Sequence, residues 1–354
     1  MALVTSTVFA CSSFSGNSLP PVTTNDGGGD ASDASAADAN RCAVDASGCV
    51  EAGAPARATC KDVASRCGSG GVDECCSANL VGGGTFNRFN DGAYPATVSE
   101  FRMDNYEITV GRFRRFVASY PGSKPANGSG RNRHNSGDLG WQAAWTALLP
   151  ADGAALTAVL QCDLGYLAFK TVAGAEMDES RPLNCLSWFE AQAFCIWDGG
   201  RLPTEAEWNY AAAGGSEQRL YPWSSPPTDP VIGQSYASYD PAGRFDCLSD
   251  GVLGCSVGDL LPVGSKAPKG NGRWGQADLA GNVWEWTQDA PDPIPSPCND
   301  CAQLATDPDG AAIKRALRGG SFFDSATDLS SFYRLSFPAS QHTFDVGARC
   351  VRDP

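Results

Sequence analysis

The sequence contains two groups of residues that could carry out chemistry by themselves. Ser321 ends an Arg-Gly-Gly-Ser segment, and His342 is the first histidine after it, so a serine nucleophile with a histidine base is one hypothesis. Serine after glycine is also a common turn residue that satisfies backbone groups. The turn interpretation is preferred, and a hydrolase remains an alternative.

Cys298 and Cys301 form the second group, a C-x-x-C pair. This spacing occurs in redox-active sites, but those sites place the pair at a helix start or in a βαβ unit. The segment around Cys298 is rich in proline and shows neither pattern. A local disulfide is therefore favoured over a redox centre.

Histidine-based iron chemistry has little support in the sequence. The chain has two histidines, His134 and His342, and they lie in separate loops. A non-haem iron site needs a cluster of about three histidine or carboxylate ligands. We therefore do not expect an iron oxygenase.

Charge and hydropathy exclude several partners. The 354 residues carry 26 basic and 40 acidic side chains, a net charge of −14, which disfavours binding to nucleic acid or to anionic membranes. The chain lacks an apolar run of about 18 residues, so no membrane-spanning helix is predicted. Membrane attachment is expected only through a lipid anchor.

Fifteen cysteines indicate an oxidising, extracytoplasmic compartment. Cys11 stands alone and follows Val8-Phe9-Ala10, which is similar to the end of a bacterial lipoprotein signal. Lipidation of Cys11 would give an outer-surface lipoprotein, and the alternative is a secreted protein. The other cysteines form one group of six, between Cys42 and Cys76, and one of eight, between Cys162 and Cys350, and both even counts suit disulfide frameworks.

Composition divides the chain into four segments. Residues 1–11 are read as part of a lipoprotein-type signal, and residues 12–41 as a disordered acidic tether with almost no large apolar side chains. Residues 42–79 form a small cysteine-rich module whose disulfide connectivity stays open. Residues 80–354 form the main domain.

Capping signals predict three helices in the main domain. Thr109 precedes an apolar helical pattern, Ser187 with Glu190 forms a capping box, and so does Thr204 with Glu207. A further helix is predicted over Ala144–Val159.

Six ordered motifs in this domain resemble the formylglycine-generating enzyme (sulfatase-modifying factor) family. They are Pro182–Trp188, Phe194–Trp208, Tyr221–Trp223, Gly281–Trp286, Arg318–Ser321 and Gly347–Cys350. The resemblance covers Leu80–Arg352. It implies a C-type-lectin-like α+β fold with much irregular structure, here preceded by the small disulfide-rich module.

The resemblance also predicts that the family's oxidation chemistry is lost. Active members hold copper with two thiolates and use oxygen to convert a sulfatase cysteine into formylglycine. The matching positions here are Asp324 and Leu329, which supply no soft sulfur ligand. Copper is therefore not expected, unless Cys298 and Cys301 are recruited to the site by the fold.

Disulfides and calcium follow from the same comparison. The family bridge implies Cys195 with Cys350, short spacing suggests Cys247 with Cys255 and Cys298 with Cys301, and Cys162 with Cys185 then remain. Asn282 and Glu285 match family positions that bind structural calcium. For a second calcium site Asp240, Asp246 and Asp250 are candidates. Arg201, Glu205 and Glu207 are expected to form buried ion pairs.

The preferred interpretation is a cell-surface or secreted protein whose domain binds a ligand or acts as a scaffold without catalysis. We expect the recognition pocket near Tyr221, Trp223, Ser321 and Asp324. The partner would be a peptide, a glycan or a surface protein. The alternative is a copper-dependent oxidase that makes formylglycine.

Overall fold

The computed structural model describes residues 43–45, 48–50, 60, 66–170, 179–304 and 313–354. Cys11, the segment 12–41 and Cys42 lie outside the described residues. The chain divides into two units, 1–55 and 56–354. In the first unit β1 (Ala43–Asp45) pairs antiparallel with β2 (Gly48–Val50).

The domain boundary predicted at residue 80 differs from the observed division. Residue 80 lies inside β5 (Ala78–Val81), which pairs with β8 (Phe101–Asp104) of the main body. Cys67 and Cys75 form a disulfide and pack against Tyr106 within one buried cluster. A segment with few apolar residues gains stability by burying its disulfides against a larger core, so the second half of the cysteine-rich module belongs to the main unit.

Three sheets of three or four strands organise that unit, with the strand orders β12-β11-β9-β13, β14-β8-β5 and β10-β7-β6. A separate two-stranded sheet in it consists of β3 and β4. The strands not yet given are β3 (Arg66–Cys67), β4 (Asp73–Glu74), β6 (Gly84–Asn87), β7 (Pro95–Val98), β9 (Trp284–Trp286), β10 (Cys298–Asn299), β11 (Lys314–Arg318), β12 (Leu335–Pro338), β13 (Val346–Gly347) and β14 (Val351–Arg352). Among them β9 is buried on both faces, since all three of its residues are buried.

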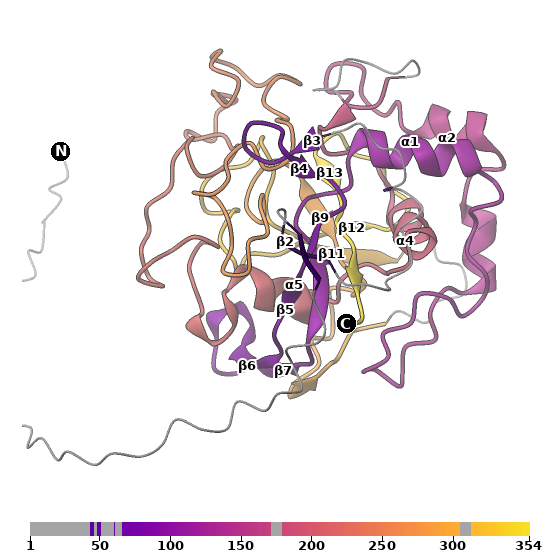
Figure 1. The fold of residues 1–354 in the computed structure, drawn as a ribbon, viewed down its shortest axis with the longest axis horizontal. Helices are drawn as coiled ribbons and strands as arrows, with labels where there is room; N and C mark the ends of the chain where they lie inside the picture. The colour runs from indigo at the N-terminus through magenta and orange to yellow at the C-terminus, as the bar shows by residue number, and fades with distance from the viewer. Residues whose placement is uncertain (1–42, 46–47, 51–59, 61–65, 171–178, 305–312) are drawn as a thin grey trace, which may run out of the picture. The chain divides into compact units, whose positions relative to one another are not determined.

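The helices are α1 (Val110–Ser119), α2 (Gly153–Val159), α4 (Trp188–Trp197) and α5 (Glu205–Ala212). The side chain of Thr109 caps α1, and both predicted capping boxes are present at α4 and α5. In Figure 1, α1, α2 and α4 gather on one side of the central strands. Phe113 of α1 stacks on Phe194 of α4 with ring centroids 5.4 Å apart, which joins these helices through their apolar faces.

The helix predicted over Ala144–Val159 is wrong in its extent. A 3-10 helix covers Ala143–Leu148, and α2 begins only at Gly153, after Asp152 caps it. Pro150 lies between them, and proline disfavours helical geometry in the residue before it.

Little regular structure lies between α5 and β9, where long loops occupy the side of the molecule away from α1 and α2 (Figure 1). Six disulfides tie the described chain together. They are Cys60–Cys76, Cys67–Cys75, Cys162–Cys185, Cys195–Cys350, Cys247–Cys255 and Cys298–Cys301. The last four are the pairs expected for the main domain. The α+β class with much irregular structure is confirmed.

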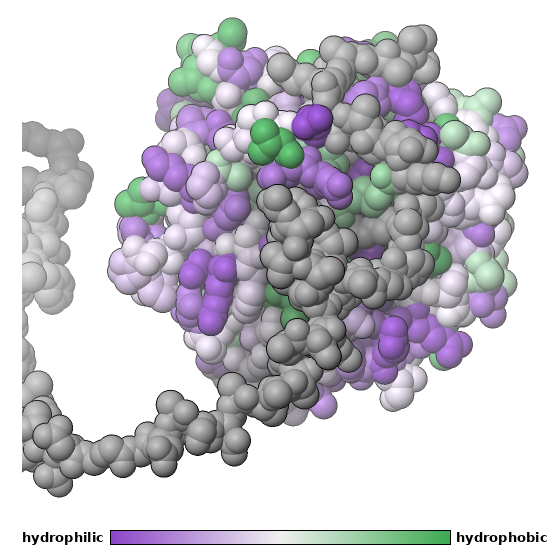
Figure 2. Space-filling model, viewed as in Figure 1, coloured by the Kyte–Doolittle hydropathy of each residue, from purple (hydrophilic) through white to green (hydrophobic). Residues whose placement is uncertain are grey.

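The visible face in Figure 2 is mostly hydrophilic or neutral, with apolar side chains in small separate spots. Within the described chain no helix is both long and apolar enough to cross a bilayer.

Candidate functional site

The turn after β11 places Ser321 at the centre of the candidate site. Gly319 and Gly320 have φ angles of 100° and 70°, which residues other than glycine rarely adopt. Ser321 is fully buried, and both its backbone N–H (3.0 Å) and its hydroxyl donate to Oδ2 of Asp324. The serine thus closes a turn with the carboxylate three residues on.

His342 does not lie in position to activate Ser321. Its Nε2 contacts the carboxylate of Glu190, at 2.9 Å from Oε2, while the Ser321 hydroxyl is bound to Asp324. Burial by itself would lower the pKa of His342, but the hydrogen bond and charge of Glu190 outweigh it and raise that pKa. The structure thus does not pair Ser321 with His342, and the contacts of Ser321 with Asp324 are those expected of a turn residue.

The structure brings the expected recognition residues together. Tyr221 stacks on Trp223 with centroids 5.3 Å apart, and its hydroxyl donates to the carbonyl of Ala326 (3.1 Å), in the loop between Asp324 and Leu329. Trp223 in turn stacks on Tyr236. This is a packed aromatic group beside the turn. Tyr221, Trp223, Ser321 and Asp324 line neither the cavity beside Trp145 and Arg315 nor the one beside β6 and β7.

Buried carboxylates meet beneath β9, at the residues expected to bind calcium. Glu285 accepts from Arg349, at 2.6 Å from its Nη2, and Asn282 donates to Glu107 (2.8 Å). Burial raises the pKa of Glu107, and the charges of Asp278 and Glu285 raise it further. Burial raises the pKa of Asp278 to about 6, and the charge of Glu285 also acts in this direction.

This cluster has three buried carboxylates, from Glu107, Asp278 and Glu285, and one guanidinium, from Arg349. The excess of buried negative charge is unfavourable unless a cation or protons compensate it. The three carboxylates do not gather one oxygen each within 4.8 Å of one another, and both oxygens of Glu285 already accept from Arg349. Glu107 and Asp278 were not predicted from sequence, because nothing in their local patterns marks them.

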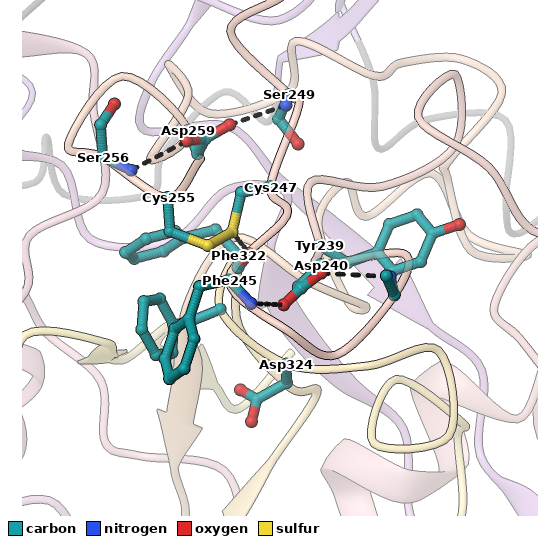
Figure 3. The surroundings of a disulfide bond; sticks show 12 residues. Tyr239, Asp240, Phe245, Cys247, Ser249, Cys255, Ser256, Asp259, Phe322 and Asp324 are labelled. Carbon is teal, nitrogen blue, oxygen red and sulfur yellow. Dashed lines mark hydrogen bonds between the residues drawn. A yellow bond between two sulfur atoms is a disulfide. The ribbon is translucent and has the colours of Figure 1, made fainter. Parts of the chain in front are cut away.

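The aspartates considered for a second calcium site bind backbone amides of their own loops instead. Asp240 uses its carboxylate oxygens to accept from the backbone amides of Ala242, Gly243 and Phe245. Asp250 accepts from Val252 in the same manner. These acids hold loops through their own backbone, a frequent role of aspartate. Asp259, which the sequence did not single out, similarly binds the amides of Ser249 and Ser256 (Figure 3).

Comparison with known proteins now gives the family. The model of the sulfatase-modifying factor enzyme 1-like domain matches residues 72–354, which is most of the chain. The chain belongs to the sulfatase-modifying factor family. It is 35% identical over 211 residues to formylglycine-generating enzyme of Mus musculus, covering 56% of this chain and 52% of that enzyme. The match thus spans about half of the mouse enzyme.

Two further relatives extend the comparison. Inactive C-alpha-formylglycine-generating enzyme 2 of Bos taurus is 30% identical over 279 residues, 74% of this chain and 81% of the bovine protein. The structure of PvdO from Pseudomonas aeruginosa has the same fold, with a TM-score of 0.51 and 17% identity over 79% of this chain and 95% of that one. Because the relatives include an enzyme and a protein named inactive, family membership alone does not decide activity.

At the family's copper-binding positions the structure places side chains with other roles. Leu329 is fully buried in an apolar cluster with Tyr221, Tyr239 and Ala280. Asp324 is committed to Ser321, and burial raises the pKa of its carboxyl group although the Ser321 hydrogen bond acts against this. Neither position can present a thiolate.

The sulfur atoms that lie next to the Ser321–Asp324 turn do not belong to Cys298 and Cys301, the pair considered from the sequence. Cys298 and Cys301 form a disulfide in the β10-β7-β6 sheet, in a different core cluster from Phe322. Cys247 instead lies beside the turn, with its sulfur 3.2 Å from the carbonyl oxygen of Phe322 (Figure 3).

The sulfurs of Cys247 and Cys255 and a carboxylate oxygen of Asp240 all lie within 4.8 Å of one another. They are the one group of this kind among the described residues. The two sulfurs are bonded to each other, so they are not thiolate ligands in this state. In the disulfide state that the structure describes, Cys247 and Cys255 therefore offer no thiolate beside the turn.

The loop closed by this disulfide exposes apolar side chains. Between residues 245 and 253, four large apolar side chains are exposed, by 65%, 43%, 66% and 72%: Phe245, Leu248, Val252 and Leu253. We call residues 245–253 the apolar loop. Phe245 also contacts Phe323 edge to face, with centroids 5.0 Å apart, which attaches the loop to the turn. Apolar side chains gathered in this way mark interaction surfaces more often than single exposed ones.

Proposed function

We propose that this chain is a non-catalytic, extracytoplasmic member of the sulfatase-modifying factor family that binds a ligand or acts as a scaffold. The observation that carries the proposal is the pair Asp324 and Leu329. One is hydrogen-bonded to Ser321 and the other is fully buried, and the family's copper chemistry requires a thiolate at each position.

The disulfides support the proposed location. Twelve cysteines of the described chain are paired in six bridges, which persist in oxidising compartments. Lipidation of Cys11 and the acidic tether 12–41 belong to this proposal as a means of surface attachment.

The apolar loop, with the half-buried Phe323 and Asp324 of the turn beside it, forms the proposed recognition surface. The loop is fixed at one end by the Cys247–Cys255 disulfide and by the contact between Phe245 and Phe323. Its exposed side chains suit a peptide or protein partner with apolar groups better than a glycan, whose hydroxyls require polar contacts. A structural calcium ion at Asn282 and Glu285, the positions that match the family's calcium ligands, belongs to the proposal as a stabilising part of the fold, with Glu107 and Asp278 close by.

Turnover of a sulfatase-motif cysteine peptide tests the loss of catalysis. The purified protein is incubated with copper, oxygen, reductant and the peptide, and the peptide mass is followed, with the mouse enzyme as positive control. We expect no aldehyde product from this chain. Conversion at a rate near that of the control would show that the protein is an oxidase.

Peptide display tests the recognition surface. A random library is selected on the intact protein and then on the variant Val252→Ser/Leu253→Ser. We expect enriched peptides to lose binding to the variant. Peptides that bind both proteins equally would place recognition elsewhere.

A copper oxidase remains as second candidate because Cys247, Cys255 and Asp240 lie together beside the turn. Reduction of that disulfide would release two thiols next to the family's site. Monovalent copper binding is measured before and after mild reduction, in the protein and in Cys247→Ser/Cys255→Ser. Binding that appears only on reduction and only with both cysteines would favour the oxidase, and its absence would exclude this pair as a copper site.

A further inference from the structure

A cavity of about 390 Å³ lies apart from the turn and the apolar loop. Its walls include Trp145 of the 3-10 helix, Trp188 at the start of α4, Arg315 of β11 and Gln288, two residues after β9. Arg315 is near the beginning of β11, whereas Ser321 follows the end of this strand. The volume is within the range of about 300–1,000 Å³ found for small-molecule sites.

The two tryptophans form an aromatic corner in this cavity. Their rings are perpendicular, with centroids 5.2 Å apart, and both side chains are buried. Trp188 is held in place because its Nε1 donates to the carbonyl of Thr287 (2.8 Å). A fixed corner of this kind provides apolar contact area at little entropic cost to a ligand.

Arg315 has no carboxylate partner among the residues described. Its side chain is 2% exposed, its Nη1 donates to the carbonyl of Gln288, and its guanidinium lies 4.1 Å from the Trp188 ring centroid. Its Nε has no hydrogen-bond partner. Burial lowers the pKa of Arg315 to about 10, although the charges of Asp289 and Asp138 oppose this.

Three other buried arginines of the fold have the carboxylate partner that Arg315 lacks within the described chain. Arg201 pairs with Glu207 at 2.6 Å, Arg318 with Glu205 at 3.0 Å and Arg349 with Glu285 at 2.6 Å. At the cavity, the two oxygens of Asp138 accept from the amides of Asn132 and Gly140, and no ion pair joins Asp138 to Arg315 among the described residues. A buried guanidinium without an anion is costly.

Gln288 supplies the second unsatisfied group. Its side-chain Oε1 is buried and has no partner, while its backbone carbonyl accepts from Arg315. A donor and an acceptor without partners therefore belong to two residues, Arg315 and Gln288, that line a cavity with apolar walls. Binding sites for small molecules have this composition: a mostly apolar lining with a few polar groups that fix orientation.

We propose that this cavity binds a small carboxylic acid with an aromatic or aliphatic body. The carboxylate pairs with the guanidinium of Arg315, which is suited by geometry to planar anions. The apolar body lies in the corner of Trp145 and Trp188. This site does not depend on the proposed recognition surface, and it would exist in a catalytic or a non-catalytic protein.

Titration with 3-phenylpropionate, indole-3-acetate and octanoate tests the proposal, with 3-phenylpropan-1-ol as the uncharged match of the first. Heat of binding and tryptophan fluorescence of the full chain are measured. We expect saturable binding of at least one acid, at least tenfold tighter than the alcohol. Equal binding of 3-phenylpropionate and the alcohol, or no saturable binding of any acid, would overturn the proposal.

Two variants locate the site. Gln288→Glu places a carboxylate beside Arg315, so we expect acid binding to fall at least tenfold while the melting temperature is retained or raised. Trp145→Ala removes one wall and should weaken binding of the acids. Arg133→Met is the control, because Arg133 is 73% exposed and does not line the cavity. Unchanged acid binding in folded Gln288→Glu would contradict the assignment.

Discussion

Arg349 and Glu285 form a buried ion pair that joins the end of the chain to its central sheet. The Nε of Arg349 donates to both carboxylate oxygens (2.9 and 2.7 Å), Nη2 donates at 2.6 Å, and the indole of Trp208 adds a bond of 2.8 Å. Glu285 lies in β9, and Arg349 directly precedes Cys350 of the long-range disulfide. This pair and this bridge thus fix the same segment.

Replacing Arg349 by methionine should destabilise the fold strongly. The change leaves Glu107, Asp278 and Glu285 buried without their counter-charge, and breaking a buried pair in this way costs about 3–5 kcal/mol. Urea unfolding measures the free energy of unfolding. Arg133→Met, at an exposed arginine, should lose about 1 kcal/mol or less. A loss as small in Arg349→Met would show that the pair contributes little.

Calcium should stabilise the protein at neutral pH, and chelation should lower its melting temperature. Without metal, the stability of the protein should instead rise as the pH falls. The folded-state pKa of Asp278 is raised to about 6, so the fold binds its proton more tightly than the unfolded chain and gains stability as the pH falls from 7 towards 4. Calcium competes with these protons, so its stabilising effect should shrink over the same range.

Melting curves at pH 7.5 and 5, with calcium or with a chelator, measure both effects. Asp278→Asn should reduce the calcium effect, whereas Asp292→Asn, at a side chain 80% exposed, should retain it. If the melting temperature of the unmodified protein is the same with calcium and with a chelator, the calcium proposal is contradicted.

The contact of His342 with Glu190 should make stability fall as the pH rises. Because the folded-state pKa of His342 is raised, its contribution is complete below about pH 6.5 and is lost as the pH passes through the folded-state value. His342→Gln should flatten this part of the stability profile. His134→Gln, at an exposed loop position, should leave the profile unchanged. Identical profiles for both variants would refute the assignment.

The two disulfides Cys195–Cys350 and Cys298–Cys301 should differ in their effect on stability. The first closes a separation of 155 residues and the second a separation of 3. In the chain-entropy model their removal by double alanine substitution costs about 5 and about 2 kcal/mol. Denaturant unfolding of both variants gives the comparison. A larger loss for the short bridge would show that packing, not loop closure, sets the difference.

Restoring cysteine at both family positions should restore binding of monovalent copper. Asp324→Cys/Leu329→Cys provides two thiols beside the intact turn, and we expect it to compete with a chromogenic copper chelator under reducing conditions. Because Leu329 is fully buried, the variant should lose about 2 kcal/mol of stability. Ser325→Cys/Ser330→Cys has the same spacing and should bind more weakly. Equal binding by the two variants would show that position is not decisive.

Local sequence patterns predicted much of the frame. Ser187 and Thr204 cap α4 and α5 with the glutamates three residues on, because a capping box depends only on neighbouring positions. Where neighbouring residues competed, the sequence misled: Pro150 divides the helix predicted over Ala144–Val159. The apolar pattern alone predicted one continuous helix, because it does not take account of the proline.

The sequence by itself determined the family motifs and the absence of thiols at positions 324 and 329, since these depend on residue identity, and the family resemblance together with short spacing implied the disulfide pairs of the main domain. Only the tertiary structure decided which charges meet. It brings Glu107 to Asp278 and Glu285, joins His342 to Glu190, and leaves Arg315 at a cavity without an ion-pair partner among the described residues. Electrostatic contacts depend on distance in space, and residues far apart in the chain carry no local signal of the partner that folding gives them.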